Sequence, residues 1–148
     1  MHLQTMMLGG VAIVVATGGP DGRPALTRGW GPQYDESKAT LTLAVTAPAG
    51  SPTLANLEWN GAIAVTVSEP LTYRTVQMKG VVEHVEAPSE DTRARARQHL
   101  DRFVADVAQL GIAHGADRLF HGDLRSVSFV VEELYEQTPG QNAGRKLK

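Results

Sequence analysis

The sequence predicts a single, mainly β domain in which six or so antiparallel strands form a small β-barrel with flanking helices. The chain has 148 residues, the size of one ordinary domain. Apolar residues make up 42% of it, which is enough for a packed core. Short β-branched runs recur between Gly, Pro and polar turn residues, as is typical of antiparallel strands. Because such strands close readily into a barrel, we expect residues 1–148 to form one domain.

The first third of the chain is expected to form a meander of three strands. Residues 11–17 are a continuous β-branched run, which is typical of a strand buried on both faces. A turn rich in Gly and Pro leads to a second strand over residues 23–34, whose glycines and internal proline indicate an edge, a bulge or a close ligand approach. Residues 39–46 then alternate apolar and polar side chains, which indicates a third strand.

The middle third is expected to supply a short helix and a hairpin. Ser51 is a typical helix N-cap, and Pro52 is a typical first helical residue. Asn60-Gly61 is a typical helix stop. Residues 62–68 and 73–85 then form the two strands of the hairpin.

The last third is expected to contain a long helix, a short helix and a final strand. The long helix begins at Pro88-Ser89, with acidic residues in its first turn, and ends near Gly111. A short helix follows over residues 116–120, and residues 125–136 form the last strand. Residues 137–148 combine Pro, Gly and basic residues and are expected to be an extended C-terminal tail.

Composition argues against several kinds of site. The absence of Cys rules out disulfides, Cys-ligated zinc and thiol catalysis. The five His residues lack the close spacing of metal ligands, so we expect no metal site. A formal net charge of -2 gives no case for binding nucleic acid. No apolar run reaches the ~18 residues of a membrane span, and no positively charged leader is seen, so we expect a cytoplasmic protein without membrane contact.

The long helix also carries a cluster of arginines. They are Arg93, Arg95, Arg97 and Arg102. Acidic residues are interleaved with them, and mixed charge of this kind is typical of a solvated helix face. We therefore expect this surface to face solvent instead of an acidic partner.

Several segments carry motifs in a consistent order. Asp21-Gly-Arg-Pro24 follows the first strand, and Arg28 lies on the second. Ser51-Pro-Thr-Leu-Ala-Asn-Leu57 opens the first helix, and the hairpin contains Gly61–Val67 and Tyr73–Gly80. In this order and spacing, the segments resemble those of the pyridoxamine-phosphate-oxidase-like FMN-binding proteins.

The resemblance covers residues 9–86 and a tail segment, residues 139–145. It implies an FMN-binding split barrel that works as a homodimer, with each site built from both subunits. The FMN phosphate is expected at the helix that Ser51 opens, because a helix N-terminus favours an anion. The implied cofactor-binding residues are Arg28, Trp30, Thr46, Ser51, Thr53, Arg74 and Thr75.

The roles implied for these residues differ. Arg28 and Arg74 pair with phosphate, although each could equally be a solvated strand arginine. Thr46 hydrogen-bonds the flavin ring. For Trp30 the sequence leaves three interpretations open: stacking on a ring system, a contact between subunits, or simple burial.

Three departures from the family pattern bear on function. Pro52-Thr53 stands where the family has Arg-Lys, and Gln33 stands where a second basic residue is common. At ~1.5–3 kcal/mol per charged hydrogen bond, losing two of them weakens FMN binding by several decades. The Trp and Arg that hold substrate in true pyridoxamine-phosphate oxidases have no match after Arg125, so we do not expect vitamin B6 phosphate as the substrate.

Two functional hypotheses follow. The first is an FMN-dependent oxidoreductase, with a deazaflavin as a variant of the cofactor and with the substrate and electron donor left open. No residue stands out as a catalytic acid or base. The second is a non-catalytic split-barrel binding module that has lost tight FMN affinity and binds another small ligand, such as a deazaflavin or haem.

Overall fold

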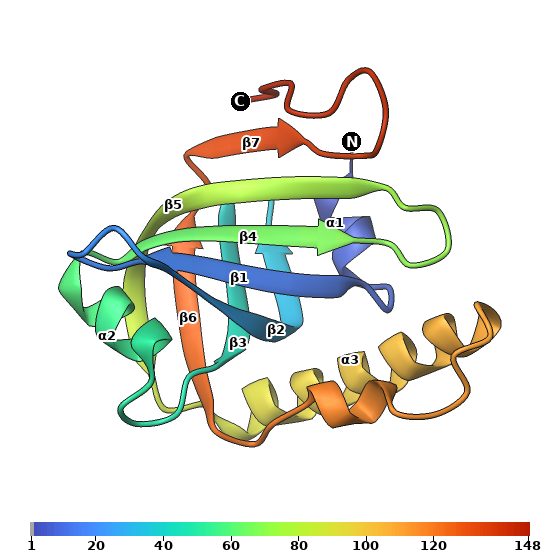
Figure 1. Ribbon diagram of the computed structural model, residues 1–148, viewed down its shortest axis with the longest axis horizontal. Coiled ribbons are helices and arrows are strands. Elements are labelled where there is room, and N and C mark those ends of the chain that lie inside the picture. Colours follow the sequence, from blue (N-terminus) through green and yellow to red (C-terminus); the bar gives the residue numbers. More distant parts are fainter. Residues whose placement is uncertain (1) are drawn as a thin grey trace.

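Six antiparallel strands close into a barrel in the computed structural model, which describes residues 2–148 (Figure 1). The strands are β1 (Ala12–Gly18), β2 (Pro24–Asp35), β3 (Thr40–Thr46), β4 (Ala62–Ser68), β5 (Thr75–Glu86), β6 (Leu124–Val130) and a short additional strand, β7 (Glu133–Glu136). Around the barrel they follow the order β4-β1-β2-β3-β6-β5, and β5 pairs with β4 to close the ring. Because β7 lies beside β5, it extends the sheet. The predicted split barrel with flanking helices is confirmed.

Within the described residues, the helices are α1 (Leu3–Met7), α2 (Pro52–Trp59), α3 (Glu90–Gln109) and the 3-10 helix η1 (Ala116–Leu119). Figure 1 shows α3 lying across one side of the barrel and α2 at the end of the β1–β2 hairpin. No local signal in the sequence predicts α1, which has no side-chain cap. Its position depends on three buried side chains that join the barrel core. None of these helices is long and apolar enough to span a membrane.

Two apolar clusters pack on opposite faces of the barrel wall. The first fills the barrel interior, with Leu41, Leu43 and Phe129 fully buried. The second lies between the outer face of the barrel and α3, and it includes Trp30 and Phe103. The outer face of β2 is therefore covered by α3 at Trp30, and the second cluster fixes the position of the helix.

The last predicted strand, over residues 125–136, is in fact two strands. The chain leaves β6 after Val130 and enters β7 at Glu133. The break occurs because β5 has two sets of neighbours: Val82 to Glu86 pair with β6, whereas Val76 to Lys79 pair with β7. Between the two strands, the amide of Glu132 donates to the carbonyl of Lys79 at 2.9 Å. A strand change of this kind depends on distant partners, so the sequence pattern does not show it.

The sequence predicted an extended tail over residues 137–148. In the structure these residues turn back along β7. The amide of Gly144 donates to the carbonyl of Glu136 at 2.7 Å, and that of Leu147 donates to Leu134 at 2.7 Å. The reversal is possible because Gly140 and Gly144 adopt positive φ angles of 142° and 86°. The tail thus covers the free edge of the short strand.

The backbone of α3 lies in close contact with β2 at Gly31. This residue has a φ of 60°, and a Cβ atom there would lie 2.7 Å from the backbone nitrogen of Ala96. No side chain fits in that space. Gly31 therefore allows the helix backbone to pack directly on β2.

We expect Gly31→Ala to destabilise the protein more than Gly22→Ala does. Gly22 also has a positive φ, of 78°, but no atom lies within 4 Å of a Cβ placed there. The control should lose about 1 kcal/mol from backbone strain alone. The clash with α3 should add about 1–3 kcal/mol at Gly31. Urea unfolding of both variants measures the difference, and equal losses would show that helix contact is not tight.

Candidate functional site

The start of α2, with Ser51 at its N-cap, is called the cradle here because a helix N-terminus can bind an anion. Ser51 is the N-cap of this helix, and its Oγ accepts a hydrogen bond from the amide of Leu54 at 3.3 Å. Pro52 occupies the first turn and is exposed to solvent. Pro52 has no N–H, and the amides of Leu54 and Ala55 donate to Ser51, so this end of α2 offers an anion the amide of Thr53 and the positive end of the helix dipole.

The position of α2 is fixed by contacts with β1. The buried side chain of Asn56 donates from Nδ2 to Oγ1 of Thr17 at 3.1 Å. Thr53 lies on the same side of the helix and is only 4% exposed. Of the two residues that replace the family's cations, Thr53 is therefore directed mainly into the protein, and Pro52 is the one that faces solvent.

Arg28 and Thr46 lie on neighbouring strands close to this helix. Gly29 pairs with Val45, so the antiparallel register places Arg28 opposite Thr46. A Cβ on Gly29 would contact Leu43 inside the barrel, so side-chain alternation directs Arg28 to the outer face. The loop of residues 47–51 joins Thr46 directly to the start of α2. Arg28 and Thr46 are therefore neighbours across β2 and β3, and Thr46 is connected by this short loop to the start of α2.

The hydroxyl of Thr46 is a buried group without a partner. Within residues 2–148, its Oγ1 makes no hydrogen bond, although its backbone carbonyl accepts one from Oγ1 of Thr27 at 2.7 Å. The residue as a whole is only half-buried, so rotation of the side chain can present the hydroxyl to a ligand. Such an unpaired group beside Arg28 and α2 is compatible with a polar ligand.

Arg74 and Thr75 lie far from this cradle in the same chain. Figure 1 shows their hairpin loop at the end of β4 opposite α2. The seven residues of β4 separate the two ends by about 20 Å, given ~3.3 Å per residue. Nη1 of Arg74 lies 3.9 Å from Oε1 of Glu69, and Oγ1 of Thr75 donates to Oγ of Ser68 at 2.9 Å. One subunit therefore does not bring all the predicted residues together.

Of the three interpretations of Trp30, the structure supports burial. The side chain is 2% exposed and packs against α3 and the segment that follows it. Its ring centroid lies 5.6 Å from that of His99, 5.9 Å from Phe103 and 5.3 Å from Phe120. In this arrangement Trp30 has no face available for stacking on a ligand.

His99 is a buried polar residue whose role the sequence does not indicate. Its Nε2 donates to the carbonyl of Val11 at 2.8 Å, and its Nδ1 accepts from the amide of Gly31 at 3.1 Å. Burial lowers the pKa of His99 to about 4; the bond to Val11 opposes the shift and the charge of Arg102 adds to it. A proton on Nδ1 would face the Gly31 N–H, so the neutral ring is the form that links α3 to β1 and β2.

Within the part of the chain that the structure describes, no three His, Asp or Glu side chains form a group that could hold a metal ion. The polar groups at the start of α2 and on Arg28 and Thr46 include a hydroxyl, a guanidinium and a helix amide. This set of groups suits a phosphate more than a metal cation.

Comparison with known proteins identifies a family and several structural neighbours. A family model described as "Pyridoxamine 5'-phosphate oxidase" matches residues 4–133. A search of curated protein sequences gives no match. A structure described as an F420 reductase has a TM-score of 0.57 at 19% identity, with 88% of this chain and 94% of that chain covered.

Two further structures have similar scores. HupZ from Group A Streptococcus has a TM-score of 0.55 at 16% identity, with 95% of each chain covered. A Clostridium acetobutylicum protein, described as related to general stress protein 26 and of the pyridoxinephosphate oxidase family, has a TM-score of 0.54 at 14% identity, with 97% of this chain and 91% of that chain covered. At these identities the neighbours establish the fold alone.

We expect the stability of the wild-type protein to fall at acidic pH through His99. The unfolded chain takes up a proton near pH 6.5, whereas the folded chain resists protonation until about pH 4. The contribution of His99 is therefore complete above pH 6.5 and is lost as the pH falls toward 4, by about 3 kcal/mol in total.

Unfolding of wild type and His99→Gln at pH 7 and pH 4 measures this contribution, because Gln retains one donor and one acceptor but does not titrate. His84, which is exposed, provides the matched control as His84→Gln. Parallel pH profiles for wild type and His99→Gln would contradict the assigned role.

Proposed function

Because the chain belongs to the pyridoxamine 5'-phosphate oxidase family, we propose that it is a flavin-dependent oxidoreductase that holds the FMN phosphate at the start of α2. The observation that supports the proposal is that the strand register places Arg28 opposite Thr46 and that a short loop joins Thr46 to the Ser51-capped start of α2. These groups offer a cation, a free hydroxyl and a helix amide, which are the groups that proteins use to bind phosphate.

Charge supports the assignment of Arg28. Among residues 2–148, no acidic side chain forms an ion pair with it. Its guanidinium is therefore available to donate charge-assisted hydrogen bonds to a phosphate. With Pro52 and Thr53 in place of two cations, binding depends on Arg28 and on the start of α2, and we expect a modest affinity.

We further propose a homodimer in which a second copy completes each site. Arg74 and Thr75 lie about 20 Å from α2 in their own subunit, the length of β4 at ~3.3 Å per residue, so a two-fold axis is the simplest way to bring them to the cradle. The outer faces of β1, β4 and β5 offer a surface for this contact. Their outward side chains include small and aliphatic residues that remain partly exposed, as at Val14, Ala64 and Val81, and on β5 also the polar Gln77 and Lys79.

In this proposal the bound flavin supplies the redox chemistry, and the chain supplies binding and orientation. Arg28 and the start of α2 would hold the phosphate, and the hydroxyl of Thr46 would be available to the ring system. Residues of the second subunit exclude water from the other side. The neighbour described as an F420 reductase supports a deazaflavin as an alternative occupant of the same cradle.

A second candidate function is a non-catalytic binding module. The observation that favours it is Pro52-Thr53, since these residues provide no positive charge for a phosphate. The absorbance spectrum of the purified protein distinguishes the two functions. Flavin bands in the purified protein or after addition of FMN support the flavoprotein, whereas a colourless protein that takes up no FMN supports the module.

We expect Pro52→Arg to tighten FMN binding about tenfold, since one charge-assisted hydrogen bond at a helix N-terminus contributes about 1.4 kcal/mol or more. Position 52 is exposed, so the new side chain needs no space inside the protein. Riboflavin, which lacks the phosphate, should gain almost nothing. Flavin fluorescence titrations measure both affinities, and equal gains for FMN and riboflavin would place the phosphate elsewhere.

We expect Arg28→Ala and Arg74→Ala each to weaken FMN binding by about 1.5–3 kcal/mol. When the two variants are mixed, we expect some sites to bind FMN with wild-type affinity again. If each site uses Arg28 of one subunit and Arg74 of the other, a mixed dimer has one site with both arginines. After subunit exchange, about a quarter of all sites should bind FMN with wild-type affinity.

Arg93→Ala is the control for these variants, because Arg93 is an exposed arginine of α3. It should bind FMN as the wild type does. If mixing Arg28→Ala with Arg74→Ala restores no strong sites, the two residues do not share a site across a dimer.

A further inference from the structure

A hollow lies beside α3, between this helix and α1. It is separate from the cluster around Trp30 and from the start of α2. It is bounded by α1, the β2–β3 turn, α3 and the outer faces of β3 and β6, and it encloses about 840 Å³. This volume lies within the ~300–1,000 Å³ that is typical of small-molecule sites. Neither Arg28 nor Ser51 contributes to its lining. We call it the α1–α3 cleft.

One stripe of α3 forms a wall of the α1–α3 cleft. Its members are Arg95, Gln98, His99 and Arg102. Their spacing of three, four and seven residues along the helix places them on one face. Arg93 and Arg97 lie outside this stripe, and Arg97 stacks over the ring of Phe120 at 5.1 Å. The arginine cluster, expected to be one solvated face, is thus divided between two environments.

Arg95 and Arg102 have no acidic partner within residues 2–148. Nη2 of Arg95 donates to Oγ1 of Thr92 at 3.3 Å, but its buried Nε has no hydrogen-bond acceptor. A buried guanidinium N–H without an acceptor is unusual, because it loses its bond to water without replacing it. The α1–α3 cleft therefore has two positive groups without an acidic partner, and one of them has a buried N–H without an acceptor.

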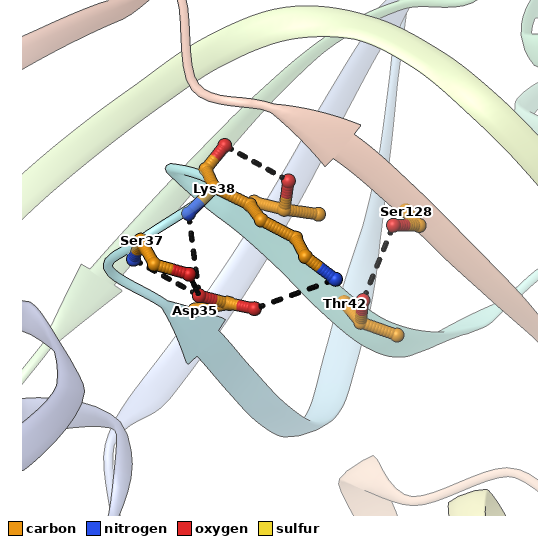
Figure 2. A network of polar contacts seen from close by, with 6 residues as sticks. Asp35, Ser37, Lys38, Thr42 and Ser128 are labelled. Atoms are coloured by element: carbon orange, nitrogen blue, oxygen red, sulfur yellow. Dashed lines mark hydrogen bonds and ion pairs between the residues drawn. The ribbon is translucent and has the colours of Figure 1, made fainter.

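The acidic residues of the opposite wall do not supply that counter-charge. Asp35 accepts hydrogen bonds from the amides of Ser37 and Lys38 and from Oγ of Ser37, and it lies 4.0 Å from Nζ of Lys38. Figure 2 shows this network within the β2–β3 turn. Its charge is satisfied locally. Glu36, at the same turn, is exposed to solvent.

The floor and the remaining wall offer further contacts of two kinds. Across β3 and β6, Oγ1 of Thr42 lies 3.2 Å from Oγ of Ser128, and Figure 2 shows the pair beside Lys38. Met7, Leu8 and Pro32 provide apolar surface around the same space. His99 has both ring nitrogens in hydrogen bonds, so it is a wall of the cleft and not a ligand group.

From these contacts we propose that the α1–α3 cleft binds a small organic anion, with its phosphate or carboxylate on Arg95 and Arg102 and its apolar body against α1. The two arginines supply charge-assisted hydrogen bonds, and the hydroxyls of the floor supply polar contacts that fix orientation. The proposal does not depend on FMN binding, because it uses different residues from the cradle at α2.

NMR titration of isotope-labelled protein tests the proposal with naphthyl phosphate, naphthoate and the neutral analogue naphthol. We expect an anionic probe to shift the amide signals of Gly31, Ser37 and Gln98 and to bind at least tenfold more tightly than naphthol. If naphthoate binds as tightly as naphthyl phosphate, the site accepts a carboxylate. If naphthoate binds more weakly, the site is selective for phosphate. Arg95→Gln and Arg102→Gln should each weaken binding about tenfold.

Arg93→Gln is the matched control and should bind naphthyl phosphate as the wild type does. Because Arg102 is exposed, Arg102→Gln should fold normally even if Arg95→Gln does not. The proposal is overturned if no anionic probe binds, if naphthol binds equally well, or if Arg102→Gln keeps full affinity. Pro52→Arg should leave unchanged the naphthyl phosphate affinity that the Gly31, Ser37 and Gln98 signals report, and a gain in that affinity would show that these signals report the start of α2 instead of the cleft.

Discussion

The direct contact of α3 with β2 at Gly31 is the constraint on which the rest of the structure depends. A helix backbone can approach a strand this closely only where a side chain is absent, and Gly31 provides that position. His99 then joins the helix to two strands by accepting from the amide of Gly31 and donating to Val11. Because the neutral ring is needed for both bonds, the same contact makes the attachment of the helix sensitive to acid.

The position of α3 divides the outer surface of the barrel into regions with different properties. Beneath the helix, Trp30 is enclosed by aromatic neighbours and is withdrawn from any ligand. Elsewhere on the outer surface, the half-buried residues Arg28 and Thr46 lie opposite each other on β2 and β3. Beside the helix, Arg95 and Arg102 face the α1–α3 cleft. The placement of this helix thus separates Arg28 from Arg95 and Arg102.

In the proposed cofactor site, the start of a helix binds the phosphate although the family's two positive residues are missing there. Ser51 caps α2 and leaves the dipole end of the helix available, whereas Pro52 adds no charge and Thr53 is buried. Arg28 is therefore the principal cation of the cradle within one subunit. The proposal includes a second subunit because β4 holds Arg74 far from α2 within one subunit.

The sequence by itself determined those features that depend on neighbours along the chain. Strand alternation, the Ser51 cap, the Gly-rich turns and the start of α3 at Ser89 are local signals, and the structure contains each of them. The short antiparallel strands also predicted a small barrel, and the family resemblance added the expected role of Arg28. The tertiary structure alone decided the burial of Trp30, the break after Val130 and the different surroundings of Arg93 and Arg95. The tertiary structure also decided the role of His99. Its two hydrogen-bond partners lie 88 and 68 residues away in the chain, and only packing brings them together.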